Sequence, residues 1–196
     1  MLGFVTVTEM SCRRFPCWAL AAAALTGNQT APVPMPIQFQ LVLKVLTAER
    51  NRPLETRKTL AIGIVYQRKS PDSRDVKDRF AAEIERGTAN RRAPPVRLGL
   101  IDVSNPANLA SEFARANPDI LYVSPLPGFD LDSIVSLSRA RKILTFTGVP
   151  AYVQSGLSVG FSSERGDARI LINRKASLAE GADFSSKLLK LAQVIE

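Results

Sequence analysis

The sequence predicts an α/β protein with a mostly parallel sheet covered by helices on both faces and an antiparallel pair of strands near its end. Apolar runs of strand length alternate with amphipathic helical segments from residue 59 to residue 147, as in repeated strand–helix–strand units. After residue 156, two further apolar runs are separated by four residues, which is typical of a hairpin. A chain of 196 residues with 45% hydrophobic residues can bury one sizeable core, so we expect a single domain.

The first strand–helix unit is the clearest. Residues 59–66 form a continuous apolar run of strand length. In the segment that follows, Val76, Phe80 and Ile84 are four residues apart and fall on one helical face, with charged residues on the others. A glycine after a helical pattern is a common stop signal, so Gly87 is predicted to end this helix.

A second unit follows directly. Residues 95–103 read as a strand, and either Ser104 or Asn105 can cap the helix that comes next. Leu109 and Phe113 are four residues apart and are predicted to pack inward.

The remaining elements repeat the pattern and then change it. Residues 119–124 predict a third strand, 130–141 a short helix and 143–147 a fourth strand. The runs 157–163 and 168–173 predict the hairpin.

Residues 36–46 stay ambiguous between a strand and a helix. Apolar residues alternate from Ile37 to Val45, which is a strand period, but the length of the segment and its initial proline also suit a buried helix.

The N-terminal segment has the layout of a secretory signal. Arg13 and Arg14 precede an apolar run over 17–25, which is shorter than the roughly twenty residues of a membrane span. We therefore assign residues 1–31 to a signal peptide with an N-terminal extension and residues 32–196 to the folded domain. Both cysteines, Cys12 and Cys17, fall in the first part, and export without domain cysteines suits a bacterial periplasm.

The charge pattern indicates a solvated surface. The formal net charge is +8, but the basic residues form short separated clusters with acidic residues between them. No aromatic-studded basic strand or recognition helix accompanies these clusters, so we do not expect nucleic-acid binding.

No catalytic constellation emerges. The sequence has no histidine, which removes Ser-His-Asp and Cys-His arrangements and the commonest metal ligand. The carboxylate pairs Asp130/Asp132 and Glu164/Asp167 lie in predicted turns and caps. We therefore expect no enzymatic activity, no metal and no cofactor.

A parallel sheet places a crevice at the carboxyl ends of its strands, where such folds usually bind ligands. The candidate binding residues at those ends are Tyr66, Gln67, Ser104, Ser124 and Thr147. Two interpretations stay open, because the same residues could simply end strands and cap helices.

Several stretches resemble one known family. They are, in order, "KVLTAERN", "LAIGIVYQ", "DILYVSP", "ILTFTGVPAYVQSGLSVGF", "RILIN" and "AEGADFSSKLLKLAQVI". Together they resemble the YfiR/HmsC-like family of bacterial periplasmic proteins over most of residues 36–195. The resemblance implies a three-layer α/β/α sandwich and favours a helix for residues 36–47.

The resemblance also implies a function. It points to a non-catalytic periplasmic regulator that binds the sensor domain of an inner-membrane protein, either a diguanylate cyclase or a sensor histidine kinase, with repression of cyclic-di-GMP synthesis and biofilm formation in the first case. A second copy of the chain, in a homodimer, is a further partner that we consider. Disulfide-based redox control cannot be carried over, because the predicted domain has no cysteine. The alternative is a periplasmic receptor that binds a small ligand in the strand-end crevice.

The C-terminal segment is predicted to be an amphipathic helix. Its apolar stripe consists of Phe184, Leu188, Leu191, Ala192 and Ile195. The stripe either closes the core or contacts a partner.

Overall fold

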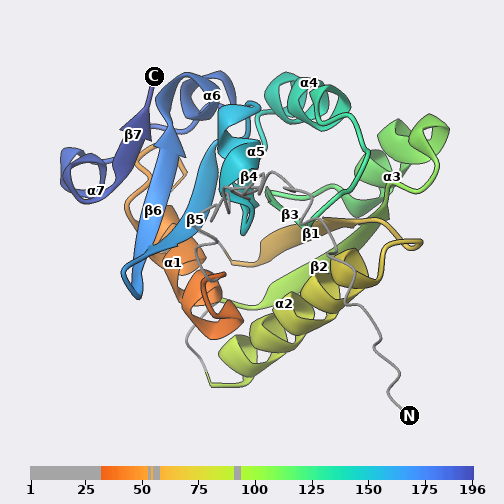
Figure 1. The fold of residues 1–196 in the computed structure, drawn as a ribbon, viewed down its shortest axis with the longest axis horizontal. Coiled ribbons are helices and arrows are strands. Elements are labelled where there is room, and N and C mark those ends of the chain that lie inside the picture. The colour runs from red at the N-terminus through yellow and green to blue at the C-terminus, as the bar shows by residue number, and fades with distance from the viewer. Residues whose placement is uncertain (1–31, 53, 55–57, 91–93) are drawn as a thin grey trace, which may run out of the picture.

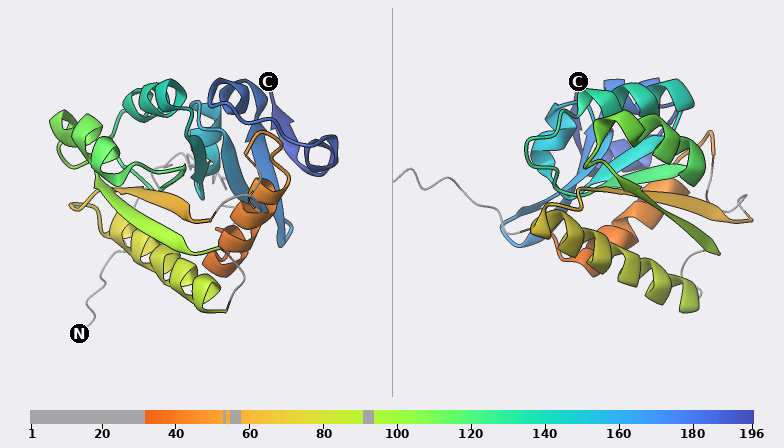
Figure 2. Two further views of the ribbon diagram at one scale, coloured as in Figure 1. Left: turned by 180° about the vertical axis from the view of Figure 1, so that it is seen from behind. Right: turned by 90° about the vertical axis from the view of Figure 1, so that its right-hand side faces the viewer.

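The computed structural model describes residues 32–52, 54, 58–90 and 94–196, so the predicted signal segment lies outside the described residues. In these ranges the chain forms three layers, as the family resemblance implied (Figure 1). Helices α1 and α2 cover one face of the central sheet, and α3 and α4 cover the other (Figures 1 and 2).

Seven strands in the described residues form one sheet in the order β2-β1-β3-β4-β5-β6-β7. All neighbouring pairs are parallel except β5 and β6, so the predicted antiparallel pair is confirmed. The strands are β1 (Leu60–Tyr66), β2 (Val96–Asp102), β3 (Ile120–Val123), β4 (Leu144–Thr147), β5 (Val159–Glu164), β6 (Asp167–Asn173) and β7 (Gln193–Ile195).

The helices alternate with these strands. They are α1 (Met35–Thr47), α2 (Pro71–Ala89), α3 (Leu109–Ala116), α4 (Asp132–Arg141), α5 (Pro150–Gln154), α6 (Arg174–Ala179) and α7 (Ser186–Leu191), with a 3-10 turn at Pro106–Asn108 before α3. Helix α5, between β4 and β5, has no counterpart among the predicted elements. Of the two predicted caps, Asn105 is the one whose side chain accepts a hydrogen bond from the first helical turn, from the Ala107 amide at 3.2 Å.

The ambiguous segment 36–46 is a helix. Its buried side chains are Gln38, Phe39, Val42, Val45 and Leu46, which follow helical spacing and not the strand alternation. Ile37, which begins the alternating pattern, is 40% exposed.

The predicted role of Gly87 is wrong. Helix α2 continues past it to Ala89, and Gly87 is buried against α1. A Cβ atom at this position would lie 2.3 Å from Cε1 of Phe39. The glycine therefore allows α1 and α2 to approach each other closely and does not terminate the helix.

The core lies on both faces of the sheet. On the α1–α2 face, Phe80 stacks on Tyr122 with ring centroids 3.7 Å apart and an interplanar angle of 14°, and Phe39 meets Phe80 edge to face at 6.0 Å. On the opposite face, the predicted inward residues Leu109 and Phe113 are buried against β2 and β3. The central strands are thus covered from both sides, as a parallel sheet requires.

The predicted C-terminal helix is correct only in its first part. Helix α7 ends at Leu191, and residues 193–195 pair with β6 as the parallel edge strand β7. Phe184 and Leu188 are buried, whereas Leu191 is 72% exposed. The apolar stripe is therefore split, because the backbone of residues 193–195 finds hydrogen-bond partners in the sheet.

One carboxylate is buried in the second half of the fold. Glu180 follows α6 and is fully buried. Its Oε1 accepts a hydrogen bond from Ser138 Oγ at 2.7 Å, its Oε2 accepts one from the Thr145 amide at 2.9 Å, and the Ser158 hydroxyl also donates to it. The side chain therefore links α6 to α4, to β4 and to the residue before β5.

Burial raises the pKa of the Glu180 carboxyl, and the hydrogen bonds from Ser158, Ser138 and Thr145 offset only part of that rise. Two cations lie nearby but contact backbone carbonyl oxygens. Arg52 donates to the Glu180 carbonyl at 3.2 Å, and Lys142 Nζ donates to the Ala179 carbonyl at 2.9 Å.

A Glu180→Gln variant should differ from the wild type in the pH dependence of its stability. A raised folded-state pKa stabilises the fold below the ordinary pKa of glutamate, and that stabilisation is lost as the pH rises through the raised value. The free energy of unfolding of the variant, relative to that of the wild type, should therefore increase as the pH rises from about 4 to neutral. Urea denaturation across this range measures the gain, with the exposed Glu164→Gln as control. Parallel stability curves for Glu180→Gln and the wild type would contradict it.

Leu188→Asp should destabilise the domain strongly. The side chain is 7% exposed and belongs to the core on the α1–α2 face, so the change removes apolar packing and buries a charge. We expect a loss of about 3 kcal/mol or more, the range measured for large-to-small core substitutions. Thermal unfolding by circular dichroism measures it. An unchanged melting temperature would show that Leu188 is not a core residue.

Candidate functional site

The sheet reverses its strand order between β1 and β3, because β2 pairs with one side of β1 and β3 with the other. In open α/β sheets such a switch point is the usual place for a ligand. Tyr66 lies there at the end of β1. Its carbonyl accepts from the Val103 amide at 2.9 Å, and Lys77 Nζ lies 5.2 Å from the centre of its ring.

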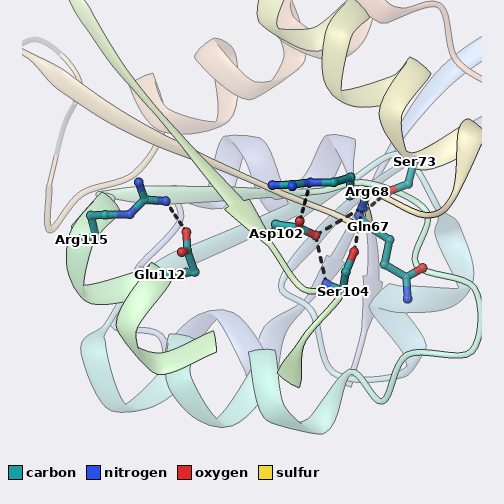
Figure 3. Close-up of polar contacts among 7 residues, drawn as sticks. All are labelled: Gln67, Arg68, Ser73, Asp102, Ser104, Glu112 and Arg115. Atoms are coloured by element: carbon teal, nitrogen blue, oxygen red, sulfur yellow. Dashed lines mark hydrogen bonds and ion pairs between the residues drawn. The ribbon is translucent and has the colours of Figure 1, made fainter. Parts of the chain in front are cut away.

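Next to Tyr66, the loops after β1 and β2 are joined by a compact polar cluster (Figure 3). The Gln67 amide donates to Ser73 Oγ at 2.9 Å. The Arg68 amide donates to Ser104 Oγ at 3.0 Å and to Asp102 Oδ1 at 3.2 Å, and Arg68 Nε lies 3.0 Å from Asp102 Oδ2.

Asp102 is the centre of this cluster. Partial burial would raise the pKa of its carboxyl, but hydrogen bonds from Ser104 and Arg68, with the charge of Arg68, outweigh burial and lower the pKa. The carboxylate is therefore ionised at neutral pH and holds the two loops together.

The other two candidates are buried. Thr147 Oγ1 donates to the Val123 carbonyl at 3.0 Å and accepts from the Val149 amide at 3.1 Å. The hydroxyl of Ser124 is buried and has no hydrogen-bond partner within the part of the chain that the structure describes.

The five candidates do not line one cavity. Ser104 lines a polar hollow of about 440 Å³ together with Arg68, Lys69, Asp102 and Asn105. Tyr66, Gln67, Ser124 and Thr147 are not among its lining residues. Whether any of the five binds a ligand stays a prediction.

A more apolar pocket of about 430 Å³ lies between the first turn of α1, the first turns of α2 and the ends of β3 and β4; we call it the α1–α2 pocket. It is lined by Pro32, Val33, Pro34, Met35, Gln38, Asp72, Asp75, Val76, Arg79, Tyr122, Pro125, Gly148 and Val149. Sequence reasoning missed it, although Gln38 was a signal as a polar residue on the buried face of an apolar helix.

The base of this pocket is polar and preorganised. The hydroxyl of Tyr122 donates to Gln38 Oε1 at 2.7 Å, and Gln38 Nε2 donates to the Val33 carbonyl at 2.7 Å. Burial raises the pKa of Tyr122, so its hydroxyl keeps its proton in any physiological condition.

An apolar groove of about 610 Å³ lies between α1, β6 and α7; we call it the α7 groove. It is lined by Leu41, Lys44, Ala48, Ala168, Arg169, Ile170, Ser185, Lys187, Leu188 and Leu191. The exposed Leu191 lies at this groove, and three basic side chains line it with the apolar residues.

The two carboxylate pairs noted in the sequence lie at the start of a helix and in a β-hairpin. Asp130 Oδ1 accepts from the Asp132 amide at 3.0 Å at the start of α4. Glu164 and Asp167 face each other across the β5–β6 hairpin, and Glu164 lies 3.5 Å from Arg169 Nε. Within the described ranges, no group of three or more potential metal ligands occurs and no helix is long and apolar enough to cross a membrane.

The fold is similar to those of three solved α/β structures. The ABC domain in complex with L-Trp from Streptococcus pneumonia is 18% identical with a TM-score of 0.56, over 83% of this chain and 62% of that one. A conserved domain protein from Vibrio cholerae O1 biovar El Tor is 14% identical with a TM-score of 0.54, over 83% and 60%. A ligand-free, open substrate-binding protein with adhesive properties from Clostridium difficile is 18% identical with a TM-score of 0.54, over 84% and 60%.

At these identities the likeness concerns the fold alone, and the chain spans only 60 to 62% of the length of these structures. No curated protein matches the chain.

The family comparison is more informative. The YfiR/HmsC-like family matches residues 53–193, which include strands β1 to β6 and the first residue of β7. Proteins of this family are periplasmic and regulatory, and in general they act in diguanylate cyclase signalling. The resemblance seen in the sequence is thereby confirmed: the chain belongs to the YfiR/HmsC-like family.

Proposed function

We propose that this protein is a non-catalytic periplasmic regulator that binds the periplasmic sensor domain of an inner-membrane diguanylate cyclase and represses it. The family match over residues 53–193 is the observation that carries this proposal. A sensor histidine kinase is the second partner class. In either case the regulator acts by contact, so a surface for the partner must exist on the folded domain.

The α7 groove is the surface that fits a protein partner best. Leu191 is a large aliphatic side chain with 72% exposure, beside the apolar Leu41 and Ile170. An isolated exposed leucine is common, but one that borders an apolar groove offers a site that a partner side chain can fill.

The charges around the groove indicate the chemistry of the partner. Lys44, Arg169 and Lys187 line it. Of these three, Arg169 is the one that forms an ion pair within the described part of the chain, with Glu164. A complementary surface would therefore present apolar side chains flanked by acidic ones. A second copy of this basic groove would place like charges opposite each other, which disfavours a homodimer through this face.

Leu191→Asp should weaken partner binding without unfolding the domain. The side chain is exposed, so the change should leave the melting temperature nearly unaltered, whereas an apolar contact in the interface would be replaced by a charge. Binding to the purified periplasmic domain of the cognate cyclase should weaken about tenfold or more, equivalent to about 1.4 kcal/mol. Biolayer interferometry measures this change.

A matched control is Leu178→Asp, because Leu178 on α6 is also exposed, at 55%, but does not line the groove. It should bind normally. In cells lacking the gene, the wild type and Leu178→Asp should lower cyclic-di-GMP and Leu191→Asp should not. Equal binding by both variants would exclude the α7 groove. An unchanged cyclic-di-GMP level on deletion of the gene would exclude the cyclase as target.

A further inference from the structure

We propose that the α1–α2 pocket binds a small organic cation, an ammonium group carried on an apolar body about the size of one aromatic ring. This goes beyond the proposed function, which needs only a surface for a protein partner. The pocket, at about 430 Å³, is within the range of roughly 300 to 1,000 Å³ that is usual for small-molecule sites.

The base of the pocket offers unused hydrogen-bonding capacity. Gln38 Nε2 carries two protons and donates one to the Val33 carbonyl, and the Tyr122 oxygen can accept in addition to its donation to Gln38. Both side chains are nearly fully buried, with exposures of 3% and 1%. A polar atom of a ligand could therefore meet a fixed donor and a fixed acceptor there.

A glycine keeps this base open. A Cβ atom on Gly148 would lie 2.7 Å from Gln38 Oε1 and 3.0 Å from the Tyr122 hydroxyl. Any other residue at this position would press on the hydrogen-bonded pair. The close approach of the β4 end to Gln38 and Tyr122 thus depends on the missing side chain.

The walls are apolar and come from four parts of the chain. Val33 and Met35 precede or begin α1, Val76 lies on α2, Pro125 follows β3 and Val149 follows β4. Side chains of this kind would surround a hydrocarbon or aromatic body and exclude water from it.

The charge of the lining selects a cation. Two acidic residues, Asp72 and Asp75, and one basic residue, Arg79, line the pocket, although the whole chain carries a formal net charge of +8. Asp75 Oδ1 is paired with Arg79 Nε at 3.0 Å, whereas Asp72 forms no ion pair among the described residues. The carboxylate of Asp72 is therefore the counter-ion for an ammonium group, and an anionic ligand would be repelled.

Asp72 also lies in the first turn of α2, where a carboxylate stabilises a helix without any ligand. Asp132 occupies the equivalent first turn of α4, on the other face of the sheet and away from the pocket. Both carboxylates lie in the first turn of a helix, and of the two only Asp72 lines the α1–α2 pocket, so Asp132→Asn is a matched control for Asp72→Asn.

Isothermal titration calorimetry of the purified protein with three probes of one shape tests the proposal: 2-phenylethylamine, the neutral 2-phenylethanol and the anionic 3-phenylpropionate. We expect the amine to bind at one site about fivefold more tightly than the alcohol, as a partly exposed ion pair of about 1 kcal/mol gives. The acid should bind more weakly than the alcohol.

Asp72→Asn should remove the preference for the amine while binding of the alcohol persists, and Asp132→Asn should keep the wild-type preference. Val76→Trp, which fills the pocket, should abolish binding of both probes. The proposal is overturned by equal affinities for all three probes, by no saturable binding of the amine, or by the same loss of preference in both Asn variants. Because no partner protein is present, failure of the proposed regulatory function would leave these results unaffected.

Discussion

The central parallel strands must be buried on both faces, and the rest of the structure depends on this constraint. On one face it places α1 and α2 so close together that Gly87 lies against Phe39. It also brings Phe80 of α2 onto Tyr122 of β3 in a stacked pair. Since the hydroxyl of Tyr122 holds Gln38 of α1, the packing of the core also fixes the base of the α1–α2 pocket.

Helix α1 lines both surfaces considered for binding. Its first turn, with Met35 and Gln38, lines the α1–α2 pocket, and its second half, with Leu41 and Lys44, lines the α7 groove. A helix packed into the core by Val42 and Leu46 holds both surfaces at a fixed separation. A partner and a small ligand could thus occupy the two ends of one rigid element without competing for the same residues.

Three of the polar residues at the strand ends, Asp102, Ser104 and Thr147, already use their side-chain oxygens in hydrogen bonds within the fold. Asp102 and Ser104 accept hydrogen bonds from a backbone amide of the loop after β1, and Thr147 Oγ1 accepts one from a backbone amide of the turn after β4. Groups already satisfied by the protein have less to offer a ligand than the Gln38–Tyr122 pair, which retains a donor and an acceptor. The base of the α1–α2 pocket therefore retains hydrogen-bonding capacity that Asp102, Ser104 and Thr147 already use within the fold.

The sequence by itself determined the fold class, the order of the main strands and helices, and the family. These follow from local periodicity and from motifs such as the Ser-Ser-x-Leu-Leu-x-Leu-Ala ending, which are contained in short stretches of chain. Residues such as Phe80 and Phe113 could be placed in the core because helical spacing alone puts them on the apolar face.

Only the tertiary structure decided the features that depend on contacts between distant segments. Residues 193–195 leave the helical pattern because they form hydrogen bonds with β6. Gly87 lies inside a helix and not at its end, and the reason for a glycine there is the Phe39 ring, which occupies the space of a side chain. The donors around Glu180 come from positions 22 to 42 residues away, and the Gln38–Tyr122 pair spans 84 residues. No local sequence pattern predicts such contacts, because the two partners are far apart in the chain and meet only when the sheet has folded.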